Sequence, residues 1–289
     1  MLGSYIKLLK LRIGLLLALT AATGYVAVAE NIQAVPLIIL IMAMFLCSSG
    51  SSVFNHFYDR DIDRLMDRTR GRPLAAGSLG EPTKALWLAG ALLVFGFLLA
   101  LIALNWIVML HLALGAFVYM VVYTVWLKRR HCINIVVGGA AGSFPVLAGA
   151  AAADPSVWLL PVLMAVTLFL WTPSHFWALA MIIKDDYAKA GIPMLPVQVG
   201  NSRCAKYMMI NTILLVVSSA LPFLFDELGL IYALAITLLG SRFLWLNWKL
   251  ILDPSRERAR VTFLFSMTYL AGVFLAIVVD KKIPLPNLF

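Results

Sequence analysis

The fold class is decided by V-P-L-I-I-L-I-M-A-M-F-L-C-S-S-G-S-S-V-F at 35–54, which N-H-F-Y-D-R-D-I-D at 55–63 follows directly. A helix that crosses the hydrocarbon core of a bilayer needs about 20 mainly apolar residues, and 35–54 reaches this length without a charged residue. Further stretches of this kind occur at 12–29, 85–104, 106–127, 133–152, 157–183, 207–225, 228–248 and 261–279. The sequence therefore predicts an all-α integral membrane protein with nine transmembrane helices.

The composition excludes a water-soluble protein. Of the 289 residues, 62% are hydrophobic and 13% are charged, and the mean hydropathy is +0.93. A soluble domain has roughly 45–50% apolar and about 25% charged residues, because its surface needs polar cover. The net charge of +9 comes from short basic groups between apolar runs, not from a basic stripe on a polar domain. We therefore expect no nucleic-acid partner.

Basic residues are distributed unevenly between the two sides of the predicted helices. Of the 23 Lys and Arg residues, only Lys281 and Lys282 fall on the side that receives the C-terminus. Short loops rich in Lys and Arg remain in the cytoplasm. The sequence therefore predicts a cytoplasmic N-terminus, and it favours a multi-pass protein of the bacterial cytoplasmic (inner) membrane.

Two long connections, 55–84 and 184–206, fall on the predicted cytoplasmic side, whereas the connections on the other side are short. Long connections in compact proteins are usually functional, and two of them on one side can form a single site. No segment indicates a separate soluble domain. We therefore expect residues 1–289 to form a single transmembrane domain with its site in these two loops.

Three side chains in the first loop have the spacing of one helix face. Asn55, Asp59 and Asp63 lie at i, i+4 and i+8, and Asp67 would follow one turn further along the same helix. Stacked carboxylates repel each other, so a bound divalent cation is the simplest reason for them. Mg²⁺ takes one or two carboxylates and fills its remaining positions with water and phosphate oxygens. The pattern therefore predicts a magnesium site.

A second set of residues repeats every four positions beside the acidic set: Arg60, Arg64, Arg68 and Arg72. Guanidinium groups donate in pairs to phosphate, although a solvated helix laced with salt bridges would show the same spacing. Asn55 at the end of a membrane span favours the functional interpretation, because polar groups are costly there. In the second loop, Asp186 belongs to a charged group that alone would indicate only an interfacial helix end.

The stretch 55–74, N-H-F-Y-D-R-D-I-D-R-L-M-D-R-T-R-G-R-P-L, resembles the N-x-x-x-D-x-x-x-D signature of the UbiA superfamily of intramembrane prenyltransferases. Further motifs resemble the branch of that superfamily that farnesylates heme: Y-T-V-W-L-K-R-R at 123–130, N-I-V-V-G-G-A-A-G-S-F-P at 134–145, T-P-S-H-F-W-A-L-A at 172–180 and D-D-Y-A-K-A-G-I-P-M-L-P-V at 185–197. The likeness extends from about residue 5 to residue 280.

The chain departs from the superfamily pattern at two places. Ile183 and Tyr187 occupy the positions of the second D-x-x-x-D motif, with two aspartates between them. The heme branch carries this shortened D-Y form, which supports the branch but puts a second directly held metal in doubt. Ser174 stands where that branch often has a second proline before the histidine, and we expect no functional change from it.

The resemblance implies transfer of a farnesyl group from farnesyl diphosphate to a vinyl group of heme b, with addition of water and release of diphosphate. It implies Mg²⁺ as cofactor. The implied catalytic and metal-binding residues are Asn55, Asp59, Asp63 and, from the second loop, Asp186. The implied diphosphate-binding residues are Arg60, Arg68, Arg72, Lys128 and Arg129. His175 is expected to meet the iron or a propionate of heme, and His56 is a second candidate for heme.

Two other functions fit part of the sequence. A UbiA-type prenyltransferase acting on an aromatic acid or quinone precursor is disfavoured by the D-Y form and by T-P-S-H-F-W. A heme transporter or oxidase assembly factor would match the composition equally well. A transporter, however, usually has paired broken helices at the bilayer midplane, whereas the polar groups here gather at one face. Beyond membrane lipid, farnesyl diphosphate and heme b, a heme A synthase or a terminal oxidase would be candidate partners.

Overall fold

The computed structural model describes residues 2–283, and in this part of the chain nine helices are long and apolar enough to cross a membrane. They are α2 (Leu11–Val28), α3 (Ala34–Tyr58), α5 (Thr83–Ala103), α6 (Trp106–Phe117) continued by η1 (Val118–Leu127), α7 (Asn134–Gly138) continued by η2 (Gly139–Gly142) and α8 (Phe144–Ala153), α9 (Leu159–Ile182), α11 (Leu195–Leu224), α12 (Leu230–Leu252) and α13 (Arg256–Lys282). The prediction of nine transmembrane helices is confirmed.

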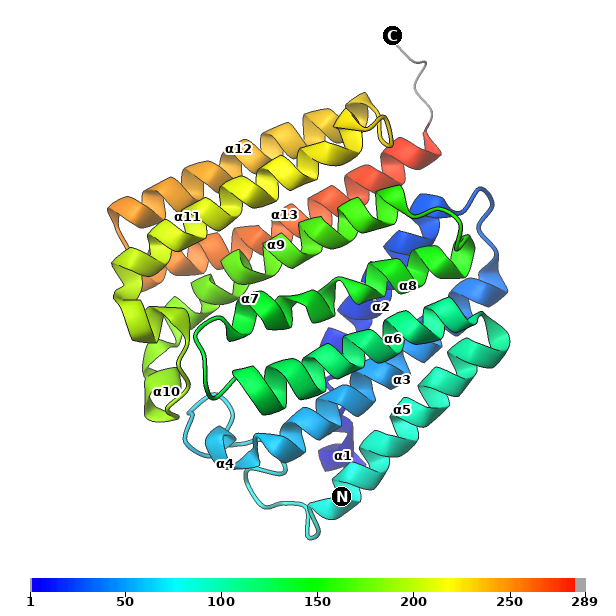
Figure 1. The fold of residues 1–289 in the computed structure, drawn as a ribbon. Helices are drawn as coiled ribbons and strands as arrows, with labels where there is room; N and C mark the ends of the chain where they lie inside the picture. Colours follow the sequence, from blue (N-terminus) through cyan, green and yellow to red (C-terminus); the bar gives the residue numbers. More distant parts are fainter. Residues whose placement is uncertain (1, 284–289) are drawn as a thin grey trace.

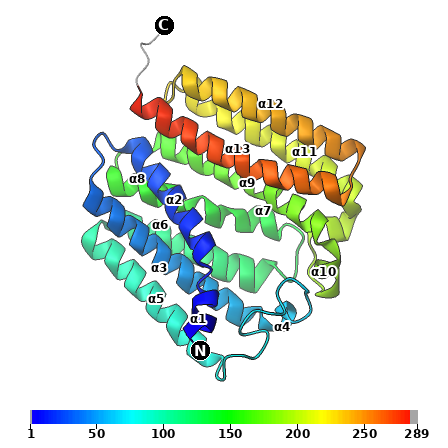
Figure 2. The ribbon, with the colours of Figure 1, turned by 180° about the vertical axis from the view of Figure 1, so that it is seen from behind.

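Three short helices lie at one end of the bundle, which we call the loop end. They are α1 (Leu2–Leu8), α4 (Arg60–Asp63) and α10 (Lys184–Lys189). The described C-terminus lies at the opposite end (Figure 1). The view from behind shows α2 crossing the bundle diagonally, with α1 below it and α4 to the right at the same end of the bundle (Figure 2). The two long connections predicted from the sequence therefore meet at one end of the fold.

Several helices are longer than their predicted spans, and two of these extensions bear on the site. The second reaches Tyr58, not residue 54, so Asn55 lies in its last turn. The seventh begins at Leu195, not at residue 207, and Gly200 with φ of 78° marks a break near its start. Much of the predicted loop 184–206 is consequently helical. A hydrophobic run predicts only the part of a helix that lies in the membrane. It does not predict the polar turns by which the helix continues beyond the membrane.

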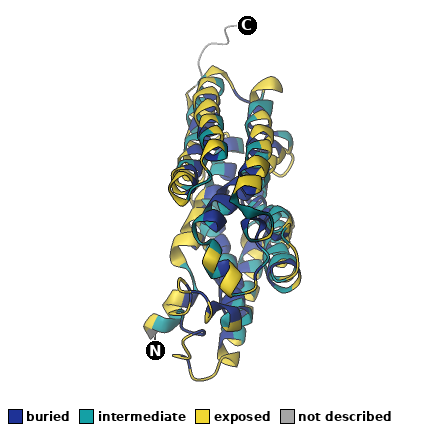
Figure 3. Cartoon of the chain, turned by 90° about the vertical axis from the view of Figure 1, so that its left-hand side faces the viewer, coloured by how far each residue is buried: buried dark blue, intermediate teal, exposed yellow. Residues whose placement is uncertain are grey.

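The surface of the bundle is apolar in the way that lipid requires. Trp87, Ile102 and Leu238 are 82%, 80% and 74% exposed. Seen along the bundle, exposed residues cover the outward sides of the helices and buried residues gather between them (Figure 3). Water would disfavour so much exposed apolar surface, whereas acyl chains accommodate it.

The helices approach closely where they carry small residues. A Cβ atom at Gly149 on α8 would overlap the carbonyl of Ala21 on α2, and one at Gly24 on α2 would overlap the carbonyl of Val146 on α8. Small residues allow backbones in a membrane to come into contact, and dispersion forces then hold them together. This crossing fixes α2, and with it the N-terminal segment that leads into the site.

Candidate active site

The acidic residues of the first loop lie where α3 ends. The backbone N–H of Asp59 donates to the Asn55 carbonyl at 2.9 Å, and that of Asp63 donates to the Asp59 carbonyl at 2.8 Å. The helical spacing thus persists through α4, and Asn55, Asp59 and Asp63 come together as predicted. All three are buried, with exposures of 3%, 0% and 1%. A carboxylate in such a place needs a cation as partner.

Each buried carboxylate has a cation beside it. Lys128, which follows η1, donates through Nζ to Asp59 Oδ2, and the Asn55 amide also donates to that oxygen at 2.6 Å. Arg72 donates through Nη1 to both oxygens of Asp63, at 3.0 and 2.8 Å. The expected phosphate ligands Arg72 and Lys128 therefore lie directly against the expected metal ligands.

Lys10 also belongs to this group, although no motif in the sequence pointed to it. It lies between α1 and α2 with φ of 47°, a left-handed conformation uncommon for a side-chain-bearing residue. Its Nζ donates to Asn55 Oδ1 at 3.1 Å. Burial, with the charges of Arg72 and Lys128 nearby, lowers the pKa of Lys10 to about 7. The nearby carboxylates of Asp63 and Asp59 act in the opposite direction and favour the charged amine.

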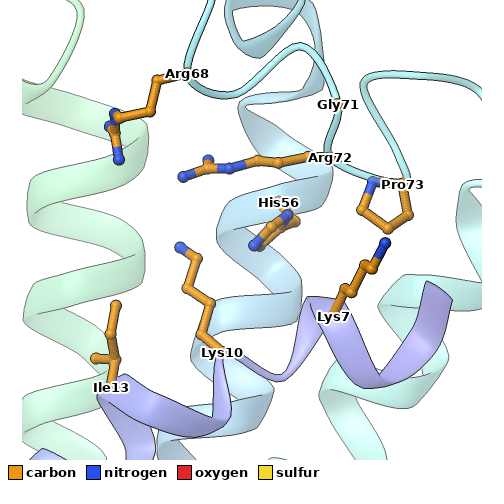
Figure 4. A pocket seen from close by; sticks show the side chains of 8 residues that line it. All are labelled: Lys7, Lys10, Ile13, His56, Arg68, Gly71, Arg72 and Pro73. Atoms are coloured by element: carbon orange, nitrogen blue, oxygen red, sulfur yellow. The ribbon is translucent and has the colours of Figure 1, made fainter. Parts of the chain in front are cut away.

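A hollow of about 490 Å³ opens in front of this group. It is lined by Lys7, Lys10, Ile13, His56, Arg68, Gly71, Arg72 and Pro73. The amino and guanidinium groups of Lys10, Arg68 and Arg72 point toward a common space with His56 beside it (Figure 4). Four of the eight lining residues are Lys or Arg and none is acidic. Such a lining suits a multiply charged anion such as diphosphate.

The residues also fit a magnesium ion bound together with a phosphate. Among residues 2–283, no three His, Cys, Asp or Glu side chains group closely enough to hold a metal by themselves. Mg²⁺ needs only one or two carboxylates when phosphate and water complete its shell. Asp59 Oδ1 is buried and accepts no hydrogen bond. An oxygen left in this state is suited to binding a cation.

The predicted arginine stripe is broken, because the helix ends at Asp63 and the chain then turns. Arg68 and Arg72 line the hollow. Arg60 instead lies over the Phe57 ring, 4.3 Å from its centroid, and donates to the Phe57 carbonyl at 2.6 Å. Arg64 donates through Nε to the Ala75 carbonyl at 2.8 Å. Neither Arg60 nor Arg64 faces the hollow that Lys10 and Arg72 line.

Asp67 does not continue the acidic stripe, so that prediction is wrong. Its exposed carboxylate lies 3.1 Å from Lys189 and 3.5 Å from Arg70. The hydrogen bond of Lys189 lowers the pKa of Asp67. The Asp67–Lys189 contact instead ties the first loop to the second.

Arg129 connects the site to its outer edge. It forms two 2.7 Å hydrogen bonds with Asp61 and lies 3.6 Å from Asp59 Oδ1. Its guanidinium is also 4.9 Å from the Tyr58 ring centroid. The hydrogen bonds from Arg129 lower the pKa of Asp61, and those to Asp61 raise the pKa of Arg129. Arg129 and Arg60 line a separate hollow of about 470 Å³ on this side.

Asp186 reaches the first loop but not the carboxylate pair. Its Oδ2 accepts a hydrogen bond from the backbone N–H of Arg68 at 3.3 Å. Within the described residues it forms no metal-binding group with Asp59 and Asp63. A metal role for Asp186 therefore remains a prediction, whereas its contact with a residue that lines the hollow is part of the structure.

The two histidines expected to meet heme differ in their surroundings. His56 lines the hollow, yet both of its ring nitrogens are buried without a hydrogen-bond partner. His175 lies on α9, away from the residues that line the hollow, and its Nδ1 is 2.7 Å from Ser266 Oγ on α13. The sequence did not indicate Ser266, which is 91 residues away and lies in an apolar span.

Comparison with known proteins places the chain in a family of prenyl-transferring enzymes. It belongs to the UbiA prenyltransferase family, whose model matches residues 16–272. The chain is 54% identical to protoheme IX farnesyltransferase 1 of Paramagnetospirillum magneticum, over 96% of this chain and 98% of that protein. It is 38% identical to protoheme IX farnesyltransferase of Granulibacter bethesdensis, over 96% of this chain and 90% of the relative.

Solved structures show the same fold at lower identity. A structure of digeranylgeranylglyceryl phosphate synthase matches with a TM-score of 0.82 at 20% identity, over 97% of this chain and 98% of the other. A UbiA homolog from Archaeoglobus fulgidus bound to GPP and Mg²⁺ matches with a TM-score of 0.69 at 19% identity, over 95% and 99%. The predicted UbiA-type bundle is therefore confirmed.

Proposed function

We propose that this protein transfers a farnesyl group from farnesyl diphosphate to a vinyl group of heme b. The C1–O bond of the allylic diphosphate breaks and C1 bonds to the terminal vinyl carbon. A water oxygen bonds to the other vinyl carbon, and a proton and diphosphate leave. The observation that carries this proposal is the 54% identity, over nearly the whole of both chains, with a protoheme IX farnesyltransferase.

The hollow at the loop end supports the donor half of the reaction. The barrier is departure of diphosphate from the allylic carbon, and groups that neutralise its growing charge lower that barrier. Lys10, Arg68 and Arg72 line the hollow and would bind the diphosphate oxygens. Lys128 is placed behind them against Asp59 and would neutralise charge at the inner side.

The carboxylates support a requirement for Mg²⁺. Asn55, Asp59 and Asp63 would hold the ion, which would supply positive charge to the leaving diphosphate when bound. Arg72 and Lys128 compensate the same carboxylates in this structure. If Mg²⁺ arrives together with the diphosphate, it compensates the charges of Asp59 and Asp63. The side chains of Arg72 and Lys128 can then turn to the phosphate oxygens.

The apolar interior supports capture of the allyl cation by a carbon nucleophile. A cation formed next to bulk water would be hydrolysed, so the site has to exclude solvent. Contacts between the two loops, Arg68 with Asp186 and Asp67 with Lys189, lie over the loop end. They are suited to covering a bound diphosphate while the apolar farnesyl chain lies among the helices.

The location proposed for the protein follows from its charges. We place the loop end and the N-terminus in the cytoplasm of a bacterial cell, with the chain in the cytoplasmic membrane as one domain. The diphosphate would then enter from the cytoplasm, and the more hydrophobic heme product would remain in the membrane for a heme A synthase or a terminal oxidase.

The experiment that tests this function compares two acceptors. Membranes containing the protein are incubated with labelled farnesyl diphosphate, Mg²⁺ and either heme b or 4-hydroxybenzoate. We expect label in heme alone. Label in the benzoate alone would replace the proposed function with prenylation of an aromatic acid, and label in neither acceptor would contradict both enzymatic functions.

A further inference from the structure

Ser266 on α13 holds two aromatic side chains of α9. Its carbonyl accepts a hydrogen bond from Trp171 Nε1 at 2.7 Å, and its hydroxyl lies 2.7 Å from His175 Nδ1. Trp171 and His175 are one helical turn apart, and their rings stack with centroids 4.3 Å apart and planes at 19°. One serine therefore fixes both the position and the rotation of the imidazole.

The position of the hydroxyl proton decides the tautomer of His175. Ser266 Oγ lies 2.6 Å from the Phe263 carbonyl oxygen. A carbonyl has no proton to give, so at this distance the proton of the serine hydroxyl must lie between the two oxygens. Ser266 Oγ is then left as an acceptor toward His175, and Nδ1 must carry a proton. In the neutral ring the other nitrogen, Nε2, keeps a free lone pair.

The surroundings leave that lone pair available. Phe263 also stacks on the imidazole, with a centroid distance of 4.6 Å and an angle of 28°. Two rings cannot stack on one face of an imidazole, so Trp171 and Phe263 cover its two faces. His175 Nε2 has no hydrogen bond among the described residues, and this nitrogen is not fully enclosed, although the residue as a whole is only 8% exposed. The two nitrogens of His56, by contrast, are both enclosed.

His175 also lies at a suitable depth. It is seven residues before the end of α9, and Asn55 is three residues before the end of α3. At 1.5 Å per residue these positions are about 10 Å and about 5 Å from the ends of their helices. Both helices run toward the loop end (Figure 1). An acceptor held at His175 would therefore lie in the apolar interior, slightly deeper than the diphosphate.

We infer that His175 Nε2 is the axial ligand of the iron in the heme acceptor, and that Ser266 is a positioning residue that keeps this nitrogen unprotonated. The inference rests on the proposed function for the identity of the acceptor. A histidine that ligates a metal usually donates its other N–H to a neighbouring group, which fixes the tautomer and makes the ligand more basic. Ser266 occupies that place. A bond to the iron fixes the porphyrin plane and hence the position of the vinyl group.

The competing explanation is that Ser266 and His175 merely join α13 to α9. A matched interhelical contact distinguishes the two explanations. Ser219 on α11 is hydrogen-bonded to Tyr269 on α13 at 2.8 Å and does not contact His175. Ser219→Ala thus removes a buried hydroxyl pair of the same kind without touching the imidazole.

The test uses the full chain in lipid nanodiscs with two probes, ferric protoporphyrin IX and metal-free protoporphyrin IX. The Soret band and the electron paramagnetic resonance spectrum report the axial ligand, and titration gives the affinity. His175→Asn is the main variant, because its side-chain amide can still donate to Ser266 while it offers no imidazole to iron. His175→Ala, Ser266→Ala, His56→Ala and Ser219→Ala complete the set.

We expect the wild type and the His56 and Ser219 variants to share a histidine-ligated spectrum, and both His175 variants to lose it. Added imidazole should restore it in His175→Ala. Ser266→Ala should weaken binding of the iron porphyrin by about 10–100-fold and leave binding of the metal-free porphyrin unchanged. The inference is overturned if both His175 variants keep the ligated spectrum. If Ser266→Ala weakened the binding of the iron porphyrin and of the metal-free porphyrin equally, the positioning role of Ser266 would be overturned.

The same preparations are assayed for farnesylated heme, which separates this inference from the proposed function. A wild type that ligates iron through His175 but forms no farnesylated heme would contradict the function and leave the ligand assignment standing. A wild type that forms the product while its spectrum does not depend on His175 would contradict the ligand assignment alone.

Discussion

Arg72 donates through a single nitrogen, Nη1, to both carboxylate oxygens of Asp63, at 3.0 and 2.8 Å. The arginine is partly exposed at the hollow, whereas the aspartate is 1% exposed behind it. The turn after α4 brings the two together across nine residues, so this ion pair closes the first loop. It links the stability of the loop to the residues proposed to bind substrate.

Arg72→Ala should destabilise the protein by about 3 kcal/mol, because it leaves the buried Asp63 carboxylate without its cation. Asp63→Asn in the same chain removes that uncompensated charge, so the double variant should recover much of the loss. Thermal unfolding in detergent, followed by tryptophan fluorescence, measures the coupling between the two sites. Strictly additive effects of the two changes would contradict the ion pair.

Arg70→Ala is the matched control for Arg72→Ala. Arg70 also contacts an aspartate of this loop, but both partners of that pair are exposed, at 70% and 59%. Exposed ion pairs contribute about 0–1 kcal/mol. We therefore expect unfolding of Arg70→Ala to stay close to that of the wild type, and a loss as large as that of Arg72→Ala would indicate a general effect of removing loop charge.

Asp59→Ala should abolish formation of farnesylated heme, by at least about 100-fold, while the protein still inserts into the membrane. The expected reason is loss of the buried oxygen that is proposed to bind Mg²⁺. Product formation from labelled farnesyl diphosphate and heme b measures the effect. Glu81→Ala, which removes a 66% exposed carboxylate near the end of the same loop, is the control. Full activity of Asp59→Ala would refute the metal role.

Removal of divalent metal from the wild-type protein should also lower the formation of farnesylated heme. Treatment of membranes with a chelator should stop farnesyl transfer, and added Mg²⁺ should restore it, because the ion proposed to be held by Asp59 and Asp63 supplies positive charge to the departing diphosphate. Calcium is the informative substitute, since it prefers longer bonds and more ligands than Mg²⁺. Undiminished activity in the chelator would show that the Lys and Arg residues of the hollow suffice.

Much of the fold follows from hydrophobic runs, because a bilayer leaves few ways to satisfy the backbone. The nine helices could therefore be predicted, and so could the convergence of Asn55, Asp59 and Asp63, since four-residue spacing is a local property of one helix. The spacing argument failed at Asp67, because nothing in the four-residue pattern reveals that the helix stops at Asp63.

The contacts that the sequence could not reveal join distant helices. Lys10 meets Asn55 across 45 residues, and Ser266 meets His175 across 91 residues. Periodicity says which face of a helix is apolar, but not which neighbour packs against it. Lys10 also depends on a left-handed backbone turn between α1 and α2, where glycine or asparagine would be the usual indication of such a turn.

Lys10→Met should weaken binding of magnesium diphosphate by about 10–100-fold, since a hydrogen bond from a charged group contributes about 1.5–3 kcal/mol. Methionine keeps most of the length of the side chain, so the path of the backbone into α2 should persist. Isothermal titration of the purified protein with magnesium pyrophosphate measures the change. Lys7→Met, at the exposed edge of the same hollow, should have a smaller effect, and the opposite order would contradict the assignment of Lys10.

Gly149→Ala should destabilise the bundle by about 2–3 kcal/mol or more, because its new methyl group would overlap the Ala21 carbonyl and force α2 away from α8. Since α2 begins at Leu11, the displacement should also move Lys10 and weaken diphosphate binding. Thermal unfolding and the pyrophosphate titration measure the two effects. Gly90→Ala on α5 is the control, because nothing lies within 4 Å of the Cβ that it would gain. Equal stability of the two variants would mean that the α2–α8 crossing does not determine the position of the N-terminal segment.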